Sequence, residues 1–196
     1  MDTPYASEPR PDTGVTNAAL GMWLFIASEV MLFGSLFSSY VLLRTGATSW
    51  PDQGSLLNVP LAGVNTVILV ASSMAILQAV RALEAGAFER FRAAMGIAVA
   101  CGVVFLVIKS VEYRGEIAQG LLPSTNNFLG LYFTMTGLHA LHVLGGIVVN
   151  GWLFVSGART WRTVPGRFSS RVRTAAIYWN FVDAVWIIMF VTLYLL

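Results

Sequence analysis

Residues 59–80 read VPLAGVNTVILVASSMAILQAV, a run of 22 residues without an acidic or basic side chain. A helix needs about 20 predominantly apolar residues to cross the hydrocarbon core of a bilayer, so this run predicts a transmembrane helix. Asn58 precedes the run and can cap its first turn. Pro60 is tolerated in that turn because the backbone N–H groups there have no helical partner. This stretch therefore places the chain in a membrane.

Four further apolar runs accompany it, at 20–43, from about residue 93, at 128–155 and at 174–196. The run that starts near residue 93 is uncharged only as far as Ile108, which is too short to cross, so its helix must carry Lys109 and Glu112 in or near the bilayer. The runs are continuous, whereas the strands of a membrane barrel alternate over about 10 residues. We predict an all-α integral membrane bundle of five transmembrane helices in one domain, 18–196, after a disordered polar tail, 1–17.

The composition of the whole chain agrees with this class. Its 196 residues are 56% hydrophobic and 11% charged, whereas a soluble domain is about 45–50% apolar and about 25% charged. The basic residues do not gather on a soluble face, so no nucleic-acid partner is expected.

Basic residues are distributed unequally between the two ends of the predicted spans. Nine lie at the end that holds the N-terminal tail, and three, Arg44, Lys109 and Arg114, lie at the other end. Cytoplasmic loops carry the excess of lysine and arginine in membrane proteins. We therefore predict a cytoplasmic N-terminus and a C-terminus outside.

Ionisable residues inside a membrane are costly, and each is a candidate for function. Glu29 lies near the middle of the first span. Beside it, Gly21, Ser28 and Ser35 recur every seven positions, which predicts a close helix–helix contact. Two interpretations of Glu29 stay open, a carboxyl group that only packs between helices and one that takes part in function.

Two further polar pairs lie three residues apart on predicted helices. Lys109 and Glu112 share a helix face and can form an internal ion pair; in the alternative, Lys109 extends to the interface and Glu112 lies there too. Asn180 and Asp183 also share a face, which predicts a polar contact into the bundle.

His139 and His142 form the most tempting metal-ligand pair in the sequence. Their spacing is compatible with the Glu-x-x-His arrangements of di-iron bundles, but those sites need carboxylates from other helices. Two ligands on one helix face cannot occupy opposite axial positions of one haem. We interpret both histidines as polar groups hydrogen-bonded across helices, with Glu112 as a candidate partner, and expect neither a metal site nor a catalytic residue in this chain.

Four stretches resemble motifs of subunit III of haem-copper terminal oxidases. They are FIASEVMLF at 25–33, VEY at 111–113, TGLHALHV at 136–143 and YWNFVDAVW at 178–186. The chain resembles the five-helix bacterial form, which lacks the first two of seven helices. Asn180 is a departure, because the family usually has histidine there.

The resemblance implies the non-redox subunit III of a cytochrome c oxidase in a bacterial inner (plasma) membrane. Such a subunit stabilises subunit I, binds phospholipid between its helices and lines an oxygen route. The haem and copper are expected in partner subunits. The expected partners are subunit I, in direct contact, subunit II and a larger respiratory supercomplex. Oxygen reduction coupled to proton translocation would belong to the complex as a whole.

Two alternatives stay open at this point. The first is the equivalent subunit of a quinol oxidase or of a nitric oxide reductase-associated homologue. The second is a small proton-coupled transporter that uses Glu29, Lys109, Glu112 and Asp183. Against the transporter, the sequence has neither an inverted repeat nor a pair of broken helices.

Overall fold

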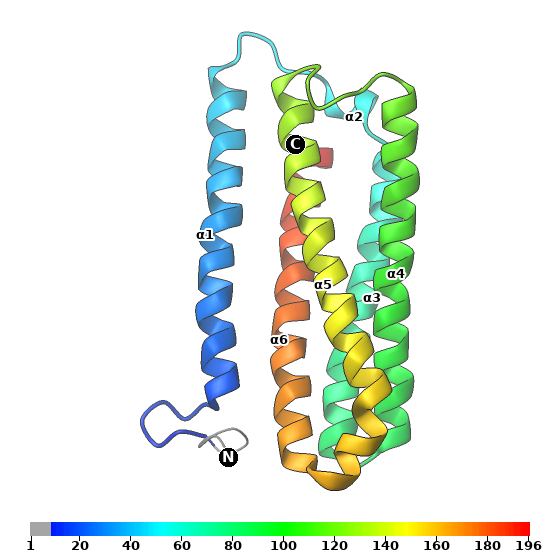
Figure 1. The fold of residues 1–196 in the computed structure, drawn as a ribbon. Coiled ribbons are helices and arrows are strands. Elements are labelled where there is room, and N and C mark those ends of the chain that lie inside the picture. Colours follow the sequence, from blue (N-terminus) through cyan, green and yellow to red (C-terminus); the bar gives the residue numbers. More distant parts are fainter. Residues whose placement is uncertain (1–8) are drawn as a thin grey trace.

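A computed structural model describes residues 9–196, which form a bundle of long helices (Figure 1). The helices are α1 (Asn17–Gly46), the short α2 (Gln53–Leu56), α3 (Val59–Glu84), α4 (Phe88–Ala118), α5 (Asn127–Thr163) and α6 (Pro165–Phe190), which continues into the π-helical turn η1 (Val191–Leu195). Five of them are long and apolar enough to cross a membrane, at Asn17–Gly46, Val59–Glu84, Phe88–Ala118, Asn127–Gly157 and Pro165–Leu195. The predicted five-helix membrane bundle is confirmed.

The helices begin and end differently from the apolar runs that predicted them. Asn58 caps α3 as expected, since its Oδ1 accepts from the Leu61 N–H at 3.1 Å. However, α4 begins at Phe88 and α6 at Pro165, several residues before the corresponding apolar runs. At about 1.5 Å per residue, these helices are longer than a hydrocarbon core of about 30 Å. Their charged first turns therefore extend beyond the apolar layer.

The predicted tail falls partly outside the described residues, which start at residue 9. Within it, residues 9–16 form a turn in which Arg10 pairs with Asp12 at 2.8 Å. This hydrogen bond from Arg10 lowers the pKa of Asp12 from its ordinary value. The Thr16 side chain then accepts from the Ala19 N–H and caps α1.

The α6 helix occupies the centre of the bundle and contacts α1, α3 and α5, while α3 packs along α4. Trp179 of α6 shows how closely the helices approach. A Cβ atom added to Gly102 of α4 would lie 2.7 Å from its ring, and one added to Gly146 of α5 would lie 2.6 Å from it. The indole N–H donates to Ser72 Oγ of α3 at 2.9 Å. One buried tryptophan thus joins four helices.

The α1 helix lies at the edge of the bundle and is the least buried of the five (Figure 1). It packs inward through one face, made of Ile26, Glu29, Phe33 and Tyr40. Ser28 and Ser35 are exposed and donate to carbonyl groups of their own helix. A Cβ on Gly21 would meet no atom within 4 Å. Within the described part of this chain, these three residues therefore make no helix–helix contact, and the predicted contact with another helix stays a prediction.

Candidate functional site

Most of the predicted intramembrane polar residues form three separate contacts, each between different helices. The first joins α1 to α5, where Glu29 Oε2 lies 2.9 Å from His142 Nε2. The other ring nitrogen, Nδ1, lies 2.8 Å from the Leu138 carbonyl oxygen. A carbonyl can only accept, so Nδ1 carries a proton and donates. The hydrogen bond between Oε2 and Nε2 therefore needs a proton on one of these two atoms.

The second place is a buried cluster around Lys109, which we call the lysine cluster. It consists of Lys109, Glu112 and Glu116 of α4, Tyr132 of α5 and Tyr194 of η1. The Lys109 Nζ donates to Glu112 Oε2 at 3.0 Å and to the hydroxyl oxygens of Tyr132 and Tyr194 at 2.8 and 2.6 Å. Of the two interpretations of Lys109, the structure shows the internal ion pair and not the extended side chain.

The two tyrosines of the lysine cluster close the network. The Tyr132 hydroxyl lies 2.7 Å from Glu116 Oε1, and the Tyr194 hydroxyl lies 2.9 Å from Glu112 Oε1. Their rings, with those of Tyr113 and Trp186, also surround the ammonium group, whose Nζ lies 4.8–5.6 Å from the four ring centroids. Aromatic faces attract cations, most strongly where water is excluded. The cluster therefore ties α4, α5 and η1 together.

The third place joins α6 to α3. Asp183 Oδ2 accepts from Ser72 Oγ at 3.0 Å and from Ser73 Oγ at 2.6 Å. Asn180 does not join this contact, because its Nδ2 donates to the Ala176 carbonyl of its own helix at 2.8 Å. The polar contact into the bundle predicted for this pair is thus made by Asp183 alone.

His139 and His142 do not act as a pair. His139 is fully buried, stacked on Trp186 with a centroid distance of 5.2 Å and edge-on to Phe105 at 5.6 Å. Neither of its ring nitrogens has a hydrogen-bond partner among the described residues. Glu112, the candidate partner from the sequence, belongs to the lysine cluster, so that part of the prediction is wrong. Within residues 9–196, no three His, Cys, Asp or Glu side chains gather where they could hold a metal ion.

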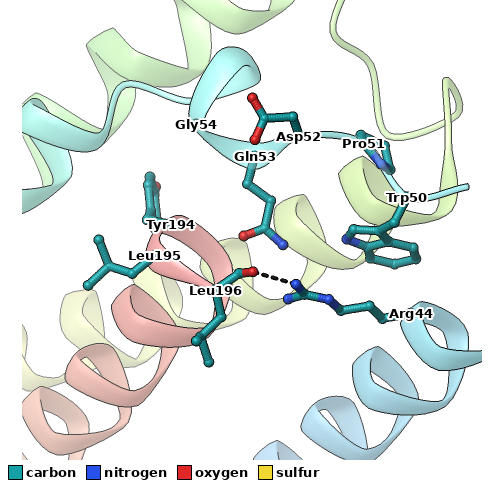
Figure 2. A pocket seen from close by; sticks show the side chains of 9 residues that line it. All are labelled: Arg44, Trp50, Pro51, Asp52, Gln53, Gly54, Tyr194, Leu195 and Leu196. Carbon is teal, nitrogen blue, oxygen red and sulfur yellow. Dashed lines mark hydrogen bonds between the residues drawn. The ribbon is translucent and has the colours of Figure 1, made fainter.

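A pocket of about 460 Å³ opens at the end of the bundle where α1 stops and η1 lies, lined by Arg44, Trp50, Gln53 and Leu196 among others (Figure 2). Arg44 donates to the Leu196 backbone carbonyl and, at 3.0 Å, to the Tyr40 hydroxyl. Gln53 donates to the same hydroxyl at 2.6 Å. These bonds attach the end of α1 to α2 and η1.

Known proteins match this chain over most of its length. The family described as cytochrome c oxidase subunit III matches residues 12–196. A cytochrome c oxidase subunit 3 of Thermostichus vulcanus is 37% identical over 90% of this chain and 86% of its own length. One from Synechocystis is 35% identical over 90% and 74%. The cytochrome bo(3) ubiquinol oxidase subunit 3 of Pseudomonas aeruginosa is 31% identical over 92% and 85%.

Proposed function

This chain belongs to the cytochrome c oxidase subunit III family, and from that membership we propose that it is the non-redox subunit III of a cytochrome c oxidase. As a member of that family it is a multi-pass membrane protein that associates with other oxidase subunits. We further propose that the protein lies in the plasma membrane of a bacterium, with its N-terminus in the cytoplasm. There it contacts and stabilises subunit I of the respiratory enzyme, assembles with subunit II, binds phospholipid and borders an oxygen route.

The observation that carries the stabilising role is that the intramembrane charged groups are paired and are hydrogen-bonded to side chains of other helices. Lys109 is held by Glu112 and two tyrosines, and Glu29 is held by His142. A buried charge is costly unless it is paired and hydrogen-bonded, and such pairs lock the geometry of the helices around them. This arrangement favours a rigid scaffold over a site for chemistry.

The residues also argue for haem and copper in partner subunits. Both ring nitrogens of His142 are engaged, and the His139 ring is enclosed by Phe105 and Trp186. A haem ligand needs a free nitrogen with room for the macrocycle in front of it, so these two residues do not fit a haem. The exposed face of α1 with Gly21, Ser28 and Ser35 suits close packing against a helix of subunit I.

A quinol oxidase is a second candidate for the complex. It is favoured by the similarity to the Pseudomonas aeruginosa protein, which covers 92% of the chain at 31% identity. The same helices would serve the same scaffold role there, because the electron donor binds to other subunits.

Purification of the chain with its partners in mild detergent tests the proposal. We expect a haem spectrum, a larger haem-bearing subunit in the mass spectrum, and oxygen consumption driven by cytochrome c; activity with quinol alone would select the second candidate. The variants His139→Ala and His142→Ala should weaken subunit association and leave the chromophore intact. Loss of a stoichiometric haem or metal from an assembled variant complex would contradict the proposal.

A further inference from the structure

The hairpin between α3 and α4 carries a pocket that none of the buried polar groups uses. It has a volume of about 460 Å³ and lies between the last turns of α3 and the first turns of α4, at the end of the bundle where α1 begins (Figure 1). Two guanidinium groups, the Gln78 amide and small or apolar side chains line it, chiefly Arg81, Arg90, Ala82, Ala93 and Ile97. The pocket is cationic near the turn and apolar toward the bilayer.

The two arginines of this pocket have no acidic partner among residues 9–196, although acids lie nearby. The two glutamates of the hairpin pair with arginines outside the pocket, Glu84 with Arg173 at 2.9 Å and Glu89 with Arg92 at 3.8 Å. Two unpaired positive charges thus line one cavity, and it has room for an anion.

Arg81 is also not needed to finish α3. The last carbonyl groups of that helix accept backbone N–H groups from the turn, with Ala85 bonded to Arg81 at 3.0 Å and Ala87 bonded to Ala82 at 2.9 Å. Gly86 makes this turn possible, because its φ of +72° lies in the left-handed region. The Arg81 side chain remains available to a ligand.

We propose that this pocket binds the phosphate group of an anionic phospholipid, with one acyl chain along the alanine-lined groove toward Ile97. Guanidinium groups donate paired hydrogen bonds to phosphate oxygens, and basic pockets between transmembrane helices bind lipid headgroups on the cytoplasmic side. Ile97 is exposed, so the apolar end of the pocket is continuous with the lipid-facing surface of α4. This inference rests on the proposed lipid-binding function, to which it adds the residues and the headgroup charge.

Native mass spectrometry of the assembled complex tests the proposal after release from nanodiscs of phosphatidylglycerol or phosphatidylcholine. We expect Arg81→Gln/Arg90→Gln to lower the phosphatidylglycerol retained on this chain about tenfold, with retained phosphatidylcholine unchanged. The matched control, Arg159→Gln/Arg162→Gln, removes the same charge from α5 at the same end of the bundle and should retain wild-type amounts. Ala93→Phe keeps both arginines but fills the groove, so it should also lower retention.

Equal losses from the two arginine pairs would mean general attraction to the bilayer and would overturn the site. Displacement of the lipid by excess inorganic phosphate would assign the pocket to a free anion instead. Full retention of phosphatidylglycerol in Ala93→Phe would show that no acyl chain occupies the groove and would overturn the site. If the glutamine pair fails to assemble, Arg81→Lys/Arg90→Lys and Ala93→Phe carry the test. Partner masses and bound haem in the same spectra report separately on the oxidase proposal, so either failure can be recognised alone.

Discussion

Glu29 and His142 share a single proton across the contact between α1 and α5. Because Nδ1 of the imidazole donates to Leu138, Nε2 can accept from a neutral donor placed where the Glu29 carboxyl lies. An amide satisfies that geometry and a methyl group does not. Substitutions at Glu29 can therefore separate hydrogen bonding from titration.

We expect Glu29→Gln to keep subunit association and oxygen consumption near wild type. Glu29→Ala should loosen α1 and release the subunit during turnover, because a buried polar group left unpaired costs about 1–3 kcal/mol. Oxygen uptake and subunit stoichiometry, followed over many turnovers, check both outcomes, with the exposed Glu89→Gln as control. A glutamine variant that assembles normally but no longer reduces oxygen would show that Glu29 acts in the chemistry.

The lysine cluster gives a second test at single residues. Lys109→Met leaves Glu112 and Glu116 buried without their cation, and breaking a buried ion pair in this way costs about 3–5 kcal/mol. The double variant Lys109→Met/Glu112→Gln should recover much of that loss, since it removes both partners of the pair. Thermal denaturation of the complex measures the difference, with the exposed Arg114→Gln as control. Additive losses in the double variant would argue against the pairing.

Sequence reasoning located Lys109 and Glu112 through their spacing, yet it missed the rest of the cluster. Glu116 follows Glu112 by four residues on the same helix face, a signal that was available. Tyr132 and Tyr194 lie on other helices and resemble ordinary membrane aromatics until the rotation of each helix is known. For the same reason the sequence indicates Glu112 as the candidate partner of the histidines, whereas the structure pairs His142 with Glu29.

At the scale of the helices, the close approach of α4, α5 and α6 depends on two glycines. The Trp179 ring occupies the space that a Cβ at Gly102 or Gly146 would need. The Trp179 side chain cannot shift without moving one of the helices around it, because protein interiors are close-packed.

Gly146→Ala should therefore lower stability by about 1–3 kcal/mol, the usual range for overpacking. Gly151→Ala on the same helix is the matched control, because a Cβ there meets no atom within 4 Å. The stability of that control variant should be unchanged or higher by up to about 1 kcal/mol, since alanine is more favourable than glycine inside a helix. Denaturation midpoints in detergent compare the two, and equal midpoints would mean that the tryptophan contact does not limit packing.

The five long helices could be predicted because four contain an apolar run long enough to cross a bilayer, and the fifth reaches that length once Lys109 and Glu112 are included. Their ends could not, because hydropathy falls at the first charged residue while the helix continues into the polar layer, as at Phe88 and Pro165. The turn η1 and the short α2 have no periodic pattern to predict them. Both are held by the Tyr40 hydroxyl of α1, which accepts from Gln53 of α2 and donates to the Thr192 carbonyl of η1.

For the whole molecule, the unequal distribution of basic residues predicts the orientation. A reporter fused after Leu196 should be active only outside the cytoplasm, and one inserted at 164–171 only inside it. A pair of enzymatic reporters, one active on each side, measures this in cells. The opposite pattern would invert the orientation and move the proposed phosphate site to the outer leaflet.

The arrangement of the helices was beyond sequence reasoning, even though their number was not. Apolar periodicity is weak in a span that meets lipid on one side and protein on the other, so it does not show which helix lies at the edge. The exposed Gly21, Ser28 and Ser35 face illustrates this, since small residues predict a contact without naming the partner. Here α1 stands at the edge and α6 at the centre (Figure 1).

The pairing of Glu29 with His142 also has a consequence for how the chain is made. The two residues are 113 positions apart, so at about 5–20 residues per second the ribosome needs roughly 6–23 s between them. During that interval Glu29 is already at the membrane and its partner does not yet exist. The first helix must therefore wait, either beside the insertion machinery or with its acid neutralised, until α5, the fourth of the five long helices, has begun to emerge. Biogenesis of this subunit thus includes a delay whose length is set by the sequence separation of Glu29 and His142.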